Sequence, residues 1–236
     1  MNSILALLQF TTILPLGKPR DFDAFARHSW IYPLAGYVIA LLVAVPVFFI
    51  SDKTLAAAVA VAGVIVLSGA HHFDGLLDTG DGLMARGDSE KRVHALTDRY
   101  VGAGGIAAGI VVTLLFFSGL QAVTAIIPVL IIGEVGAKFS MAFLTVYGIP
   151  FKEGMQSYLH RFVRPYFPVF SLLLCVPLIL LPVTPVQLTA AFIMMILCPV
   201  ILLGIAKHCF GGVNGDIVGA SNEITRALIV VAIAVL

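Results

Sequence analysis

Long apolar runs separated by short polar segments fill most of the 236-residue chain. A helix that crosses a membrane needs about 20 predominantly apolar residues. The pattern predicts membrane spans near 30–50, 55–72, 104–120, 122–146, 166–182 and 187–206. A last apolar run, 222–236, stops with the chain and predicts a short or tilted span. The first run, Met1–Leu16, is short and contains Pro15, so we expect it to lie in the interface or to form a re-entrant segment.

The composition supports a membrane protein. Sixty per cent of the residues are hydrophobic, only 11% are charged, and the mean hydropathy is +1.05. Soluble domains are about 25% charged. No soluble domain or fixed-period repeat is apparent. We therefore predict one domain, 1–236, with an all-α fold: a polytopic integral membrane helical bundle of about six to seven transmembrane helices. The net charge of +1 and the absence of a basic tract indicate no nucleic-acid partner. We also expect no signal peptide, because no basic residue precedes the first apolar run.

The positive charges predict an orientation. If the N-terminus is cytoplasmic, four polar segments face the cytoplasm: 17–29, 73–103, 147–165 and 207–221. Together they hold 11 of the 14 lysines and arginines, whereas the opposite side holds only Lys53. Such asymmetry is typical of cytoplasmic loops. The sequence thus predicts a multi-pass protein of the cell membrane with its active-site loops in the cytoplasm.

An acidic cluster marks the start of segment 73–103, which we interpret as a cytoplasmic catalytic loop. In HHFDGLLDTGDGLMAR, which covers 71–86, His71, Asp74, Asp78 and Asp81 are spaced by three, four and three residues, so a helix would place them on one face. Carboxylates this close repel one another, and a divalent cation relieves the repulsion. Hard oxygen ligands favour Mg²⁺, with Mn²⁺ as an alternative, and such a cation commonly holds phosphates. The other interpretation is a solvated acidic cap.

Further charged residues accompany this cluster. Asp98, just before the next span, could complete the coordination or serve as an N-terminal helix charge. Arg86 and Arg99 suit diphosphate oxygens, because guanidinium groups bind phosphate in a forked geometry. Lys138 follows Glu134 by four residues inside a span, where ionisable groups are expensive. A structural ion pair and a substrate contact both remain open for that pair.

A second polar cluster lies near the C-terminus. The stretch GGVNGDIVGASNEITRA places Asn214, Asp216 and Glu223 among several glycines. A glycine-rich backbone with polar side chains can cradle a ligand. The alternative is a flexible turn with a polar residue capping the next helix.

Four stretches of the chain together resemble the adenosylcobinamide-GDP ribazoletransferases, also called cobalamin synthases. The N-terminal LLQFTTILPLG and WIYPLAGYVIAL are similar to the start of that family, and the core H-x-D-G-x-x-D-T-x-D-G is intact at 72–82. A third stretch, YGIPFKEGM, is a looser match. GGVNGDIVGASNEITRALIV is similar to the family's C-terminal pattern, with Asn214 where the family usually has threonine.

The resemblance implies an activity and its partners. Members transfer the adenosylcobinamide-phosphate group from adenosylcobinamide-GDP to alpha-ribazole or its 5′-phosphate, release GMP and require Mg²⁺. The carried-over roles are catalytic for His72, Asp74, Asp78, Asp81 and Asp98, with the first three aspartates also holding the metal. We expect the substrate-binding residues to be Arg86, Arg99, Lys138, Asn214, Asp216 and Glu223. Membrane lipid and other late cobalamin-pathway enzymes are the further partners expected.

Two other functions remain open. Residues 78–86, DTGDGLMAR, match D-x-x-D-G-x-x-A-R, the first half of the CDP-alcohol phosphotransferase motif. The second half would need an aspartate four residues after Asp98, and position 102 is glycine. A cation-coupled transporter could use Asp74 and Asp78 as ligands, but the cluster lies at the membrane face, and the halves show no inverted repeat.

Overall fold

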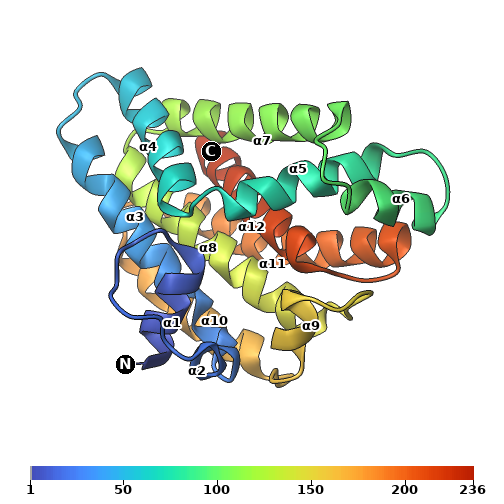
Figure 1. Cartoon of the computed structure of the whole chain (residues 1–236). Helices are drawn as coiled ribbons and strands as arrows, with labels where there is room; N and C mark the ends of the chain where they lie inside the picture. The colour runs from blue at the N-terminus through green and yellow to red at the C-terminus, as the bar shows by residue number, and fades with distance from the viewer. Residues whose placement is uncertain (1) are drawn as a thin grey trace.

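The computed structural model describes residues 2–236, which form α-helices and two short 3₁₀-helices with no strand among them (Figure 1). The α-helices are α1 (Asn2–Thr11), α2 (Phe22–Ala26), α3 (Tyr32–Phe48), α4 (Lys53–Leu67), α5 (His71–Met84), α6 (Ser89–Leu96), α7 (Ala103–Ala122), α8 (Ile126–Tyr147), α9 (Met155–His160), α10 (Phe167–Cys175), α11 (Pro185–Phe210) and α12 (Gly215–Ala234). The 3₁₀-helices are η1 (Ser29–Ile31) and η2 (Val176–Leu180).

Five helices are long and apolar enough to cross a membrane. They are η1–α3 taken together (Ser29–Phe48), α7, α8, α11 and α12; the bent pair α4 and α5 would make a sixth. The prediction of an all-α, multi-pass bundle is confirmed. α1, with ten residues, is about 15 Å long, half the roughly 30 Å of a hydrocarbon core. It packs beside α2, where the Phe10 and Phe22 rings lie 5.1 Å apart.

A sharp bend interrupts the predicted span 55–72. α4 ends at Leu67, and α5 leaves at 92° to it. Gly69 and Ala70, with φ of +62° and +58°, make the turn. Glycine adopts this left-handed conformation without penalty, whereas alanine is strained there. Segment 73–103, expected as a loop, therefore contains most of α5 and all of α6.

Two predicted spans have different boundaries. The run 166–182 is not one regular helix, because α10 gives way to η2, which contains Pro177. Proline has no N–H to continue the α-helical ladder. The run 222–236, expected to be short, belongs to α12, which begins at Gly215 and has 20 residues. Its polar N-terminal half is largely buried against the bundle.

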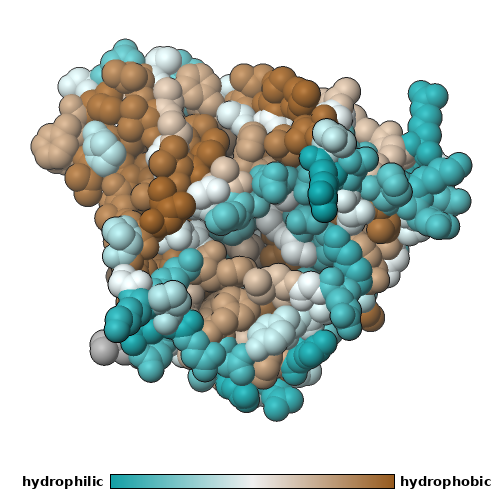
Figure 2. All heavy atoms as spheres, in the orientation of Figure 1, coloured by the Kyte–Doolittle hydropathy of each residue, from teal (hydrophilic) through white to brown (hydrophobic). Residues whose placement is uncertain are grey.

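α8 lies at the centre of the bundle, because 89% of its most apolar stretch is buried, whereas α11 is peripheral, with 22% of its most apolar stretch buried. α7 exposes Ile106, Ile110 and Leu114, which share one helical face at four-residue spacing. In water such a stripe would be costly, but it suits contact with lipid. Figure 2 shows hydrophobic side chains over α3, α4 and α7, and polar ones gathered along the side that carries α6, α9 and α2.

Candidate functional site

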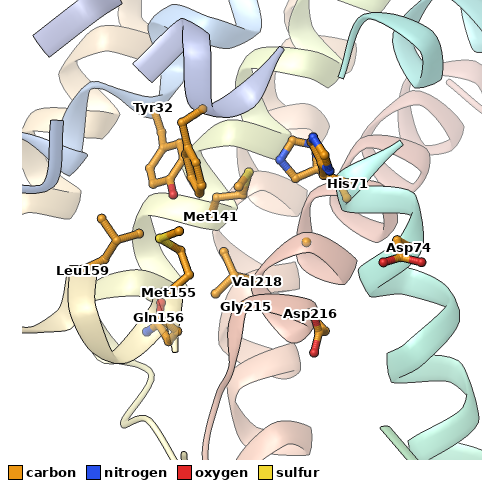
Figure 3. Close-up of a pocket in the computed structure, with 13 residues that line it drawn as sticks. Tyr32, His71, Asp74, Met141, Met155, Gln156, Leu159, Gly215, Asp216 and Val218 are labelled. Atoms are coloured by element: carbon orange, nitrogen blue, oxygen red, sulfur yellow. The ribbon is translucent and has the colours of Figure 1, made fainter. Parts of the chain in front are cut away.

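A cavity of about 460 Å³ opens between α5, α9 and α12, with residues of α1, α3 and α8 completing its wall (Figure 3). It lies among the segments where the sequence analysis placed chemistry. The lining residues are Phe10, Tyr32, His71, His72, Asp74, Met141, Met155, Gln156, Leu159, Gly215, Asp216, Val218 and Gly219.

The cavity has an acidic wall and an apolar wall. Asp74 projects from α5 and Asp216 from α12, and the two lie toward the same side in Figure 3. Tyr32, Met155 and Leu159 face them across the opening. The acidic wall therefore suits a cation, or a ligand that binds through a cation. The apolar wall suits an apolar or aromatic group.

Glycines allow α5 and α12 to approach closely enough to form the acidic wall. A Cβ on Gly75 would lie 2.5 Å from the carbonyl oxygen of Asp216, and a Cβ on Gly219 would lie 3.2 Å from Cα of His72. Only glycine fits at the first of these contacts without moving a backbone. Of the C-terminal glycines, which could have marked a flexible turn, Gly215 and Gly219 belong to the packed helix α12, whereas Gly211 and Gly212 precede it.

Asn214 fixes the start of α12. Its Oδ1 accepts from the backbone N–H of Ile217 at 3.1 Å, and its Nδ2 donates to Oδ2 of Asp216 at 2.6 Å. The first bond is an N-cap, and the second orients the carboxylate at the cavity. The sequence left two interpretations of this cluster open, a helix cap and a ligand loop. Asn214 is a helix cap beside a cavity, and Asp216 lines that cavity.

Negative charge accumulates beside the cavity. The carboxylate of Asp78, half-buried on α5, is repelled by those of Asp216, Asp74 and Asp81, while Lys152 attracts it. Lys152 lines an adjoining cavity of about 260 Å³ that shares Met155, Gln156, Gly215 and Asp216 with the first. The two cavities adjoin each other along the start of α12.

Asp81 makes a different set of contacts. Its Oδ2 accepts from the N–H of Gly102 at 2.7 Å and its Oδ1 from the N–H of Gly105 at 2.8 Å. Both oxygens therefore bind the first turn of α7, where free N–H groups and the helix dipole favour an anion. Across residues 2–236, no group of three or more His, Cys, Asp or Glu side chains is arranged to hold a metal ion. The helical spacing predicted for the aspartates is present, but their three carboxylates do not converge.

Lys138 and Glu223, predicted to bind substrate, lie in the core and do not line the cavity. Lys138 Nζ donates to Oδ1 of Asn222 at 2.8 Å, and Asn222 Nδ2 donates to Oε1 of Glu223 at 2.9 Å. These bonds join α8 to α12 inside the bundle.

Arg226 completes this network and was assigned no role from sequence. Its guanidinium donates to Oε1 of Glu134 at 2.9 Å and pairs with Glu223. It also lies 4.6 Å from the centre of the Phe116 ring. The partner of Glu134 is thus Arg226 rather than Lys138. The three-residue spacing from Glu223 to Arg226 was the signal available in the sequence.

The remaining predicted residues divide into buried and exposed. His72 is buried at the cavity wall, and its Nδ1 has no hydrogen-bond partner within residues 2–236. Arg86, Asp98 and Arg99 are exposed and do not line the cavity. Asp98 Oδ1 accepts from the N–H of Tyr100 at 3.1 Å, a local turn contact.

Comparison with known proteins identifies the family. The sequence model of cobalamin-5-phosphate synthase matches residues 3–234. The chain belongs to this family. A relative from Methanocella arvoryzae, named adenosylcobinamide-GDP ribazoletransferase, is 32% identical over 96% of this chain and 92% of its own length. Relatives of the same name from Methanosarcina mazei and Halorubrum lacusprofundi are each 31% identical, over 99% and 96% of this chain and 94% of their own lengths. No solved structure matches the chain. In this chain, the acidic wall formed by α5 and α12 comes from the two stretches, 72–82 and 211–230, that carry the resemblance noted above.

Proposed function

We propose that the protein is an adenosylcobinamide-GDP ribazoletransferase, which transfers the adenosylcobinamide-phosphate group from adenosylcobinamide-GDP to alpha-ribazole or its 5′-phosphate and releases GMP. The observation that carries the proposal is the match to the cobalamin-5-phosphate synthase family over residues 3–234. The cavity between α5 and α12 is the place that we assign to the reaction, because it joins the two motif segments.

Mg²⁺ is part of the proposal. Mg²⁺ keeps several waters and is commonly bound by one or two carboxylates together with substrate phosphates. Asp74 and Asp78, four residues apart on one face of α5, fit such a site because no salt bridge within residues 2–236 neutralises them. Bound there, Mg²⁺ would supply positive charge to the diphosphate of the donor. The donor is then needed to complete the coordination, which agrees with the lack of a three-residue protein site.

The chain's own residues perform positioning and proton transfer. We assign to Asp216, oriented by Asn214, the role of accepting the proton of the attacking ribose hydroxyl of the acceptor. Lys152 offers a positive charge to the departing GMP. Tyr32, Met155 and Leu159 form an apolar surface for the planar base of the acceptor. Phosphoryl transfer depends mainly on such positioning and on charge neutralisation.

The orientation and further partners are also proposals. The asymmetry of the basic residues supports a protein of the cell membrane whose cavity opens to the cytoplasm. Its apolar helices would contact membrane lipid and could give other late cobalamin-pathway enzymes a surface on which to assemble. The family match favours this function over a CDP-alcohol phosphotransferase or a cation-coupled transporter.

The test uses the purified full-length protein in lipid vesicles. Adenosylcobinamide-GDP, alpha-ribazole and Mg²⁺ are supplied with or without EDTA, and GMP and cobalamin are quantified together. We expect equal amounts of both products, and their loss with EDTA. A parallel reaction replaces the donor with a CDP-linked alcohol. The proposal fails if a folded preparation forms neither product, or if only the CDP-linked donor is consumed.

A further inference from the structure

A second cavity, of about 520 Å³, lies where η1, the start of α10 and the segment after α9 meet. It shares no residue with the 460 Å³ cavity. Its lining consists of basic and aromatic side chains and contains no carboxylate. The residues are Arg27, His28, Trp30, Arg161, Phe162, Arg164, Tyr166, Phe167 and Phe170.

The positive charge of this cavity is not neutralised by the protein. Arg161 and Arg164 form no salt bridge with any side chain in residues 2–236. Arg27 has a single acidic partner, Asp23, at 3.8 Å, and its guanidinium lies 4.9 Å from the centre of the Phe162 ring. The cavity is thus lined by three guanidinium groups, of which only that of Arg27 has a carboxylate partner, and that carboxylate lies outside the lining. An anion is the complementary ligand.

The cavity lies at the expected boundary between membrane and water. Trp30 belongs to η1, where the span Ser29–Phe48 begins. Its ring is 5.6 Å from that of Phe170, and Tyr166 lies 5.4 Å from the same ring. Aromatic side chains gather at such boundaries because their rings are apolar and carry polar tips.

An apolar track leaves the cavity along α10. Phe170 is part of the lining, and Val169 and Leu173 are 58% and 59% exposed on the same helix. A ligand with an anionic head and apolar chains would satisfy both surfaces at once. A free phosphate would leave the track uncovered.

We propose that this cavity binds the head-group phosphate of an anionic membrane phospholipid, with the acyl chains of that lipid lying along α10. Arg161 and Arg164 would take phosphate oxygens through forked hydrogen bonds. The three arginine side chains in the lining repel a head group that carries its own cation, such as choline. A glycerol-type anionic head group has no such cation.

Trp30 makes the proposal testable, because it is the only tryptophan in the chain and it lines the cavity. The full-length protein is placed in phosphatidylcholine vesicles doped with phosphatidylglycerol that carries brominated acyl chains, which quench nearby tryptophan. Brominated phosphatidylcholine measures the quenching by bulk lipid. We expect half-maximal quenching at about tenfold lower mole fraction for the brominated phosphatidylglycerol.

The double variant Arg161→Gln/Arg164→Gln should remove this preference. A matched control, Lys18→Gln/Lys91→Gln, removes two exposed positive charges outside the lining and should keep it. Equal quenching by the two lipids in the unchanged protein would overturn the proposal. It would also fail if the arginine variant retained the lipid preference, or if inorganic phosphate in the millimolar range abolished it. A raised KM for adenosylcobinamide-GDP in the arginine variant, with quenching unchanged, would assign the cavity to the donor instead.

Discussion

Asp78 and Asp81 are three residues apart on α5, yet their surroundings differ. Both carboxylate oxygens of Asp81 accept hydrogen bonds from the backbone N–H groups of Gly102 and Gly105. Asp78 has only like charges and Lys152 near it, so its charge is available to a ligand. The sequence motif treats the two aspartates alike, and only the arrangement of α5 against α7 separates them. We infer that Asp78 has the more direct part in catalysis and that Asp81 positions α5.

Replacing Asp78 by asparagine should therefore reduce turnover without unfolding the protein. We expect a loss of about 100-fold in kcat, comparable to the removal of one electrostatic contact to a transition state. The measurement is GMP release in lipid vesicles, with circular dichroism to check the fold. Asp88→Asn is the matched control, because Asp88 caps α6 through the N–H of Lys91 and asparagine caps equally well. Activity of Asp78→Asn within twofold of the unchanged protein would contradict the assignment.

The buried network around Arg226 leads to a stability prediction. Arg226→Met would remove the only side chain that forms salt bridges with Glu134 and Glu223 within residues 2–236, and Lys138 would be the one basic residue left in this buried network. Breaking a buried pair by removing one partner costs about 3–5 kcal/mol. The midpoint of thermal unfolding in detergent should fall markedly, whereas the exposed Lys53→Met should shift it little. An unchanged midpoint for Arg226→Met would show that the network does not stabilise the fold.

At this scale, sequence reasoning found the residues but not their partners. The motif spacing predicted Asp74 and Asp216, which line the cavity. It could not pair Glu134 with Arg226, because 92 residues separate them and only tertiary packing brings them together. It also assigned Lys138 and Glu223 to substrate binding, since a charge within a span looks functional until its internal partners are known.

At the scale of elements, the packing of α5 against α12 builds the cavity. If Asp74 and Asp216 lay on solvated loops, their carboxylates would lie apart, and no apolar side chains would face them. The bend after α4 directs α5 across the bundle, and Gly75 lets it touch the first turn of α12. The site thus depends on a distance between two backbones.

Gly75→Ala should disturb that distance. The new Cβ would meet the carbonyl oxygen and Cα of Asp216, so α5 and α12 must separate. A misplacement of about 1 Å can cost about 100-fold in rate. We expect a comparable loss of GMP release with the helical content retained. Gly204→Ala on α11 is the control, because its Cβ would meet nothing within 4 Å. Full activity of Gly75→Ala would show that the contact is not needed.

The elements were predictable where hydropathy alone decides them. The runs 104–120, 122–146 and 187–206 correspond to α7, α8 and α11. Errors arose where a local conformation or burial decides. Pro177 lies where α10 gives way to η2, and Gly69 and Ala70 bend the run 55–72. The first two turns of α12 contain polar residues, so the hydropathy pattern did not include them in the predicted span. A hydropathy profile cannot detect such features. It assigns a polar residue the same value whether its side chain is hydrogen-bonded inside the bundle or exposed to water.

On the scale of the whole molecule, neighbouring segments supply the two cavities discussed above. α9 supplies Met155, Gln156 and Leu159 to the first, and the segment after it supplies Arg161 and Arg164 to the second. Polar side chains gather along this part of the surface, and hydrophobic ones cover α3, α4 and α7 (Figure 2). The basic segment 147–165, which the sequence analysis assigned to the cytoplasm, contributes to both cavities, and its orientation in the membrane stays a prediction.

This arrangement leads to a prediction about orientation. Lys53, at the start of α4, should face the outside of the cell, and Glu90, on α6, should face the cytoplasm. Both are exposed, so a cysteine at either position can be labelled. In a variant with Cys175, Cys198 and Cys209 replaced by alanine, Lys53→Cys should react with a membrane-impermeant maleimide added to intact cells. Glu90→Cys should react only after the membrane is permeabilised. The opposite result would place the cavity on the outer face, where a donor present in the cytoplasm could not reach it directly. The proposed function would then require a separate route for the donor.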